Sequence, residues 1–275
     1  REAGIEQMIF VTGRGKSVIE DHFDIAFELE HTMTSRGRDV SVLANTRLSP
    51  GNCVYVRQQE PLGLGHAIWC ARDIIGDEPF AIFLPDEFMH GSPGCMKQMV
   101  DAYHQIGGNV ISVLEVPRND VSSYGVIAPG AAHGAVTEVL GLVEKPKNPE
   151  SNIAVTGLYF YDNKCVEMSK SLKPSDRGEL EITDLNNLYL KKKNLDVLLL
   201  DEGTAWLDAG TPKSMFEASD FVKLVEEKQG YKIAVLEEVA YNMGYINKDQ
   251  LIKNANKYKT GCEYGDYVKS LINEQ

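Results

Sequence analysis

Two aspartates follow short apolar runs in distant parts of the sequence. Asp86 comes after an apolar run that begins at Phe80, and Asp208 comes after Trp206 and Leu207. A continuous apolar run is typical of a buried parallel strand in an α/β protein, and ligands bind beyond the carboxyl ends of such strands. A proline-aspartate pair by itself also fits an ordinary turn. Together, the two carboxylates can share one Mg²⁺, whose remaining positions are usually filled by phosphate oxygens and water.

A second candidate site is a glycine-containing turn behind the expected strand that ends at Gln58. Gly63 and Gly65 stand in this turn, and a helical segment follows. Glycines let the backbone approach a flat ligand closely, and a glutamine offers one donor and one acceptor at a fixed spacing, which suits the amide edge of a pyrimidine. His66 is interpreted as a polar residue at the start of the helix rather than as a catalyst.

Charged residues at two further places can contact a phosphorylated sugar. Glu144 and Lys145 precede Pro146, so Glu144 can hydrogen-bond sugar hydroxyls while Lys145 neutralises a phosphate. An exposed ion pair in a loop is an equally good interpretation of the same two residues. Arg177 is a further phosphate-binding candidate, whereas the lysines at 191–193 fit the charge preference of a helix C-terminus.

The N-terminal segment does not complete a P-loop. Gly15, Lys16 and Ser17 match the end of that motif, but Phe10 stands where it requires a glycine. The residues up to Gly4 are typical of the last turn of a helix. This pattern predicts that the native protein is longer at its N-terminus by a strand and a loop.

The composition argues against several classes of protein. The chain has 275 residues with 28 basic and 40 acidic side chains, and its net charge of −12 argues against partners such as nucleic acid or an anionic membrane surface. The five cysteines contain no Cys-x-x-Cys pair, which indicates reduced thiols in a cytoplasmic protein, without a zinc site or a disulfide framework. No apolar run approaches the roughly 18 residues of a membrane span, and the N-terminus shows no secretory pattern.

The order of the expected elements predicts an α/β fold, with a Rossmann-like mixed, mainly parallel sheet flanked by helices and a helical C-terminal tail. After residue 116 the strands have fewer helices between them, which predicts mixed or antiparallel strands over a substrate pocket. We expect one α/β domain over residues 1–210 and a helical segment over 211–275 for packing or oligomerisation. The expected strands are 7–12, 53–58, 80–84, 109–116, 124–127, 136–143 and 153–161, and the expected helices are 17–30, 93–106, 212–227, 236–243, 248–258 and 264–272.

Longer motifs carry a resemblance to known families. Residues 4–146 contain Val11-Thr12-Gly13-Arg14-Gly15-Lys16, Arg57 to Ala67, Leu84-Pro85-Asp86 and Gly141 to Pro146. This part resembles bacterial UTP-glucose-1-phosphate uridylyltransferases. Residues 151–271 contain Val155 to Asp162, Leu172 to Ser175, Arg177 to Asp184 and Ala205 to Thr211, with alanine at 209 where threonine is usual. This part resembles glucose-1-phosphate thymidylyltransferases, and both families belong to the sugar-phosphate nucleotidylyltransferases.

The resemblance implies a Mg²⁺-dependent nucleotidyl transfer. An oxygen of glucose-1-phosphate would attack the α-phosphorus of UTP or dTTP, giving UDP-glucose or dTDP-glucose and releasing pyrophosphate. Positioning and charge neutralisation would provide most of the catalysis. The resemblance implies that Gln58 and Gly63 hold the base and that Asp86 and Asp208 bind the metal. It implies that Lys145 and Arg177 bind the sugar phosphate. The residues implied to line the glucose pocket are Tyr124, Gly125, Glu144, Gly157 and Glu179. Lys145, Arg177 and Asp86 are the expected catalytic residues.

One motif of both families is missing from this sequence. They begin with a glycine-rich loop, Gly-x-Gly-Thr-Arg followed by Pro-x-Thr-Lys, which grips the triphosphate. The chain as written is therefore expected to be nearly inactive, and a chain with about fifty restored upstream residues is expected to be active. A non-catalytic nucleotide-sugar binding or regulatory subunit is the alternative. The first half, which contains the base-contacting residues, favours UTP, whereas the second half favours dTTP. The tail together with the resemblance implies a homo-oligomer, either a dimer or a tetramer.

Overall fold

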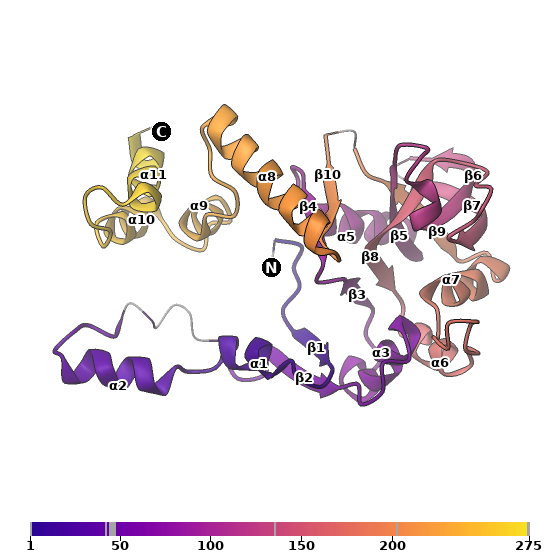
Figure 1. The fold of residues 1–275 in the computed structure, drawn as a ribbon, viewed down its shortest axis with the longest axis horizontal. Coiled ribbons are helices and arrows are strands. Elements are labelled where there is room, and N and C mark those ends of the chain that lie inside the picture. Colours follow the sequence, from indigo (N-terminus) through magenta and orange to yellow (C-terminus); the bar gives the residue numbers. More distant parts are fainter. Residues whose placement is uncertain (1, 42, 44–47, 135, 202, 274–275) are drawn as a thin grey trace. The chain divides into compact units, whose positions relative to one another are not determined.

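The computed structural model describes residues 2–41, 43, 48–134, 136–201 and 203–273 (Figure 1). Apart from the first two residues, the contacts divide the chain into two compact units. Unit 1 contains Ala3–Leu84 and Gly91–Thr204, and unit 2 contains Pro85–His90 and Ala205–Gln275. The second unit therefore takes a short internal segment as well as the C-terminal part of the chain. The expected division into domains at residues 210 and 211 stays a prediction, because compactness alone does not show independent folding.

Unit 1 is built around a six-stranded sheet with the order β3-β8-β5-β9-β7-β6. Within this sheet only β5 and β9 are parallel, and the other pairs are antiparallel. A separate parallel pair is formed by β1 and β2. The strands are β1 (Met8–Thr12), β2 (Cys53–Arg57), β3 (Phe80–Phe83), β5 (Asn109–Glu115), β6 (Gly125–His133), β7 (Val136–Glu144), β8 (Ile153–Tyr161) and β9 (Leu195–Leu199).

Helices lie on both faces of this sheet. Two contacts of β8 show this, since neighbouring residues of a strand point to opposite sides. On one face, Tyr103 of α5 packs against Phe160 of β8 with ring centres 4.4 Å apart. On the other, Tyr161 of β8 stacks on Tyr189 of α7 at 5.7 Å. The helices of unit 1 are α1 (Ser17–Phe23), α2 (Phe27–Ser35), α3 (Leu64–Cys70), α4 (Arg72–Ile75), α5 (Cys95–Ile106), α6 (Lys164–Lys170) and α7 (Ile182–Lys191), with a 3₁₀ turn, η2 (Val121–Ser123).

The predicted mixed α/β sheet flanked by helices is confirmed, whereas the predominance of parallel pairing is not. The strand at 80–84 was expected to be buried and parallel, but β3 lies at the edge of the sheet, antiparallel to β8, and Phe83 is exposed. The short connection between β6 and β7 contains Gly134 with a φ of 65°, and so short a connection permits only antiparallel pairing. The helix α6, the strands β4 and β9 and the 3₁₀ turn η2 were not expected.

Unit 2 combines a short antiparallel ribbon with helices. The ribbon pairs β4 (Glu87–His90) with β10 (Ala205–Asp208). Thr211 caps the next helix, since its side chain accepts the backbone N–H of Ser214 and the Ser214 hydroxyl accepts the N–H of Thr211. The helices of unit 2 are α8 (Pro212–Gln229), α9 (Leu236–Asn242), α10 (Lys248–Ala255) and α11 (Glu263–Asn273), which confirm the expected helical tail. Throughout the described residues, every helix is too short or too polar to cross a membrane.

The hydroxyl of Tyr161 provides a test of this core. It is fully buried and donates to Asn186 Oδ1 at 2.5 Å, while Asn186 Nδ2 has no partner in the described part of the chain. Tyr161→Phe would leave the Oδ1 atom unpaired as well. We expect the free energy of unfolding to fall by about 1–3 kcal/mol, measured by urea denaturation. The matched change Tyr245→Phe, at an exposed position, is expected to alter it by less than about 0.5 kcal/mol. Equal effects of both changes would contradict this account.

Candidate active site

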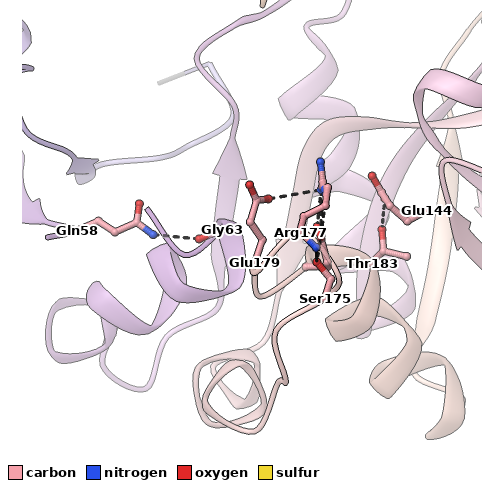
Figure 2. Close-up of polar contacts among 8 residues, drawn as sticks. Gln58, Gly63, Glu144, Ser175, Arg177, Glu179 and Thr183 are labelled. Atoms are coloured by element: carbon pink, nitrogen blue, oxygen red, sulfur yellow. Dashed lines mark hydrogen bonds and ion pairs between the residues drawn. The ribbon is translucent and has the colours of Figure 1, made fainter. Parts of the chain in front are cut away.

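The glycine turn, residues 58–66, joins β2 to α3 in unit 1. The side-chain amide of Gln58 lies inside this turn, where Nε2 donates to the carbonyl of Gly63 at 3.0 Å (Figure 2). The same Nε2 lies 3.1 Å from Nδ1 of His66. Gly63 precedes the first residue of α3 and has a φ of 91°, a conformation that favours glycine. The turn is therefore held in shape by one of the residues that the sequence assigned to base binding.

Backbone hydrogen bonds of Leu180 fasten the glycine turn to a distant part of unit 1. The Leu180 N–H donates to the carbonyl of Leu62 at 2.7 Å, and the N–H of Gly65 donates to the carbonyl of Leu180 at 2.9 Å. We call these two bonds the Leu180 clamp. A Cβ atom on Gly63 would lie 2.9 Å from the Leu180 oxygen and 3.0 Å from Cβ of Glu179. Only glycine fits this close approach.

The segment on the other side of the clamp, residues 175–183, holds Arg177 in place. Arg177 donates to both oxygens of Glu181, at 2.8–3.1 Å, and its Nη2 lies 3.4 Å from Glu179 Oε2 (Figure 2). Ser175 donates a further hydrogen bond of 2.7 Å to Glu181. The Glu181 side chain is only 12% exposed, whereas that of Arg177 is 50% exposed. The guanidinium is thus anchored on one side and open to solvent on the other.

Glu181 is a functional candidate that the sequence reading missed. Burial alone would raise the pKa of its carboxyl group, but hydrogen bonds from Arg177 and Ser175, with the charges of Arg177 and Lys145, lower this pKa below its ordinary value. The same contacts raise the pKa of Arg177. The four-residue spacing between Arg177 and Glu181 was visible in the sequence, but without a helix over this segment it carried no prediction.

Glu144 and Gly125 face each other across the β6–β7 ladder. The Glu144 carboxylate accepts a hydrogen bond of 2.5 Å from the hydroxyl of Thr183, which the sequence reading also missed (Figure 2). A Cβ atom on Gly125 would lie 3.3 Å from Glu144 Oε2 and 3.7 Å from Thr183 Oγ1. The absence of a side chain at position 125 therefore leaves space directly over the carboxylate.

Lys145 has a strained backbone. Its φ is 44°, which is uncommon for a residue other than glycine, and its N–H donates to the carbonyl of Tyr124 at 3.0 Å. Such a conformation costs on the order of 1–3 kcal/mol and is concentrated at functional sites. The Lys145 side chain is exposed, and its positive charge lowers the pKa of Glu181. Lys145 and Arg177 thus share one carboxylate neighbour.

Gly157 occupies a different kind of place from the other predicted residues of unit 1. It lies buried in β8, and its carbonyl accepts the N–H of Leu84 at 3.1 Å. The contacts of unit 1 therefore bring together Gln58, Gly63 and Glu179 at the clamp, and Tyr124, Gly125, Glu144, Lys145 and Arg177 around Glu181 and Thr183. Gly157 is instead part of the sheet beneath them.

The two candidate metal ligands lie together in unit 2. The carbonyl of Asp86 accepts the N–H of Ala209 at 2.7 Å, next to the end of the β4–β10 ribbon. A Cβ atom on Gly210 would lie 2.8 Å from Asp208 Oδ1 and 3.3 Å from Asp86 Oδ2. Both carboxylates therefore reach the same small volume. Two carboxylates at one place suit a divalent ion that takes its other ligands from phosphate and water. The described residues offer no cluster of three or more metal-ligating side chains.

A third carboxylate, that of Glu87, accompanies the acid pair and was not predicted. Glu87 lies opposite Asp208 in the ribbon and accepts a hydrogen bond from the indole N–H of Trp206. The pKa of Glu87 is raised to about 7, mainly because of burial; the charges of Asp208 and Asp86 also raise it, and the Trp206 hydrogen bond lowers it. No local pattern in the sequence indicates this pKa, because it depends on pairing between strands more than a hundred residues apart.

Comparison with known proteins identifies the family. The family model described as Nucleotidyl transferase matches residues 3–224. The chain belongs to the nucleotidyl transferase family. This nucleotidyl transferase is 41% identical over 225 residues to the glucose-1-phosphate thymidylyltransferase of Mycolicibacterium smegmatis, covering 82% of this chain and 75% of the relative. It is 42% identical over 188 residues to the UTP-glucose-1-phosphate uridylyltransferase of Komagataeibacter xylinus, covering 67% of this chain and 66% of the relative.

A solved structure supports the same assignment. The nucleotidyl transferase chain is similar to UDP-glucose pyrophosphorylase in complex with UDP-glucose, with a TM-score of 0.68 and 33% identity over 80% of this chain and 81% of that one. The fold and the family are therefore established together. The roles of the individual site residues remain predictions, which the contacts described above make testable.

Glu181 leads to a prediction about pH. Because the pKa of Glu181 is lowered in the folded state, its ion pair stabilises the protein above the ordinary glutamate pKa, and this contribution is lost as the pH falls through the folded value. We expect Glu181→Gln to lower the free energy of unfolding clearly at pH 7 and much less near about pH 3.5. Urea denaturation at both pH values measures this. Glu217→Gln, which breaks an exposed ion pair with Lys213, should matter little at either pH. An effect of Glu181→Gln that does not change with pH would contradict this prediction.

Gly210 leads to a prediction about the acid pair. A side chain at position 210 would press on the Asp208 carboxylate and occupy the volume that both acids reach. We expect Gly210→Ala to weaken Mn²⁺ binding about 10- to 100-fold, as changes around metal ligands commonly do, measured by water proton relaxation. Gly203→Ala is the control, since a Cβ atom there has no neighbour within 4 Å in the described chain. Equal Mn²⁺ affinities of the two variants would show that the acid pair does not bind the ion.

Proposed function

We propose that this nucleotidyl transferase transfers the uridylyl group of UTP to glucose-1-phosphate, giving UDP-glucose and pyrophosphate. The observation that carries the proposal is the Leu180 clamp, which fastens the glycine turn to the segment of Arg177 and Thr183. A base-binding turn and a group of sugar-phosphate ligands are thereby held in one unit. Relatives named glucose-1-phosphate thymidylyltransferase and UTP-glucose-1-phosphate uridylyltransferase support the reaction class.

In this reaction one bond forms and one breaks. A phosphate oxygen of glucose-1-phosphate bonds to the α-phosphorus, and the bond from that phosphorus to the oxygen bridging the α- and β-phosphates breaks as pyrophosphate leaves. No proton has to move in this step, so the residues mainly position groups and neutralise charge. Lys145 and Arg177 bind the sugar phosphate. The glucose lies among Tyr124, Gly125, Glu144, Gly157 and Glu179, with Gly125 providing the space over Glu144.

Asp86 and Asp208 are the proposed ligands of Mg²⁺. An ion held by them would neutralise phosphate oxygens as negative charge shifts to the pyrophosphate. Family membership supports a divalent cation in general, and the convergence of the two carboxylates at Gly210 supports this pair as its ligands. Glu87 keeps its indole hydrogen bond and serves to hold the ribbon.

The choice between UTP and dTTP is the finer part of the proposal. Uracil and thymine differ by one methyl group, which is worth about 1–3 kcal/mol in a pocket, or roughly 10- to 200-fold in rate. The glycine turn resembles uridylyltransferases, so UTP is the preferred substrate and dTTP the second. A cytoplasmic location and a homo-oligomeric state, dimer or tetramer, complete the proposal.

A non-catalytic nucleotide-sugar binding subunit is the competing function. Relatives named as thymidylyltransferase and uridylyltransferase favour catalysis over binding alone. Binding of UDP-glucose without any pyrophosphate release would favour the competing function instead.

The decisive experiment compares Arg177→Ala with Arg118→Ala, an exposed arginine in the loop after β5. Pyrophosphate release from UTP and glucose-1-phosphate is measured for the 275-residue chain and for a chain extended by the glycine-rich segment of a relative. We expect Arg177→Ala to lower kcat/KM for glucose-1-phosphate about 10²- to 10³-fold, since it removes a preorganised cation, and Arg118→Ala to leave it unchanged. UDP-glucose binding by calorimetry, in the absence of turnover in either form, would establish the binding subunit.

A further inference from the structure

The amide group of Gln58 has one defined orientation in this structure. Its Nε2 atom lies 3.0 Å from the carbonyl oxygen of Gly63, and a carbonyl can only accept a hydrogen bond. The reverse orientation would bring two oxygens together, so the assignment of nitrogen and oxygen follows from the contact itself. Figure 2 shows Nε2 directed at Gly63 and Oε1 directed away from it.

This orientation fixes the proton of His66. The same Nε2 atom lies 3.1 Å from Nδ1 of His66, and because Nε2 has only hydrogens to offer, Nδ1 must be the acceptor. The ring proton of neutral His66 is therefore on its Nε2, which lies 3.8 Å from Sγ of Cys70. Burial raises the pKa of the Cys70 thiol, which keeps the sulfur neutral beside this N–H. The same sulfur lies 4.0 Å from Nδ1, so the imidazole is in contact with both Gln58 and Cys70.

Both hydrogens of the Gln58 amide are thus used within the turn. Across the described residues, no hydrogen bond reaches Oε1 of Gln58. A ligand that meets this side chain therefore encounters an acceptor and no donor. The glutamine that first appeared able to read a base with one donor and one acceptor presents the acceptor alone.

We propose that His66 is a positioning residue that holds the Gln58 amide with Oε1 toward the nucleobase, so that the turn selects a pyrimidine that carries a hydrogen on N3. The inference rests on the proposed function and extends it to base selection. Uracil and thymine carry a hydrogen on N3 and can donate to Oε1, whereas N3 of cytosine is an acceptor and would oppose it. The locked amide therefore admits both UTP and dTTP and rejects CTP.

The test compares the dissociation constants of UDP-glucose and CDP-glucose by calorimetry on the 275-residue chain. The wild type is expected to bind UDP-glucose at least about 100-fold more tightly than CDP-glucose, because a mismatched partner leaves Oε1 unpaired. His66→Phe should weaken UDP-glucose binding about 3- to 10-fold, as expected for the loss of one neutral hydrogen bond. It should also reduce the ratio of the CDP-glucose dissociation constant to the UDP-glucose dissociation constant. His66→Asn keeps an acceptor, Oδ1, at the position of Nδ1 and should restore both values. His104→Phe, at an exposed position of α5, is the control.

Each outcome supports or overturns the inference. An unchanged ratio in His66→Phe would overturn the positioning role, since a purely structural residue would change both affinities together or neither. Equal binding of the two ligands by the wild type would overturn the orientation of Gln58. Binding of neither ligand would instead refute the proposed function, and base selection would fall with it. Nitrogen-15 NMR of the unaltered protein provides a check without mutation, because a neutral His66 protonated on Nδ1 would also overturn the inference.

Discussion

The candidate site of unit 1 depends on two backbone hydrogen bonds at a single residue. Leu180 receives the N–H of Gly65 and donates its own N–H to Leu62, so the glycine turn and the Arg177 segment are joined by main-chain atoms. Such bonds do not depend on which side chain stands at 180. They do depend on how closely two segments of the chain approach each other. This constraint explains why Gly63 and Gly65 cannot carry side chains, because a Cβ atom on either would lie 2.9 Å from the Leu180 oxygen.

The electrostatics of the site are arranged around carboxylates, as suits a chain with a net charge of −12. Glu181, nearly buried, holds Arg177 through direct hydrogen bonds and lies within the field of Lys145. Its negative charge offsets the repulsion between these two cations. In unit 2 the pKa of a carboxyl group shifts in the opposite direction. Burial raises the pKa of Glu87, and the nearby charges of Asp208 and Asp86 raise it as well.

Much of this arrangement could be predicted from local patterns, and the rest depended on pairing between distant strands. The convergence of Asp86 and Asp208 was anticipated because each follows an apolar run. The antiparallel order of the sheet was not, because an apolar strand such as β8 has the same sequence pattern whichever way its neighbours run. The role of Glu181 could not be predicted from the sequence for a related reason. Its contacts with Arg177 form across an irregular loop, where neither helical nor strand periodicity indicates which side chains meet.

The ribbon of unit 2 has one more consequence. The chain contains two tryptophans: Trp206 in β10, bonded to Glu87, and Trp69 in α3 of unit 1, beneath the guanidinium of Arg72 at 4.6 Å. Each unit thus carries its own intrinsic fluorophore, one beside carboxylates and the other beside cations. Replacing either tryptophan by phenylalanine would leave a single tryptophan, so that fluorescence changes at the β4–β10 ribbon and at α3 could be followed separately without an added label.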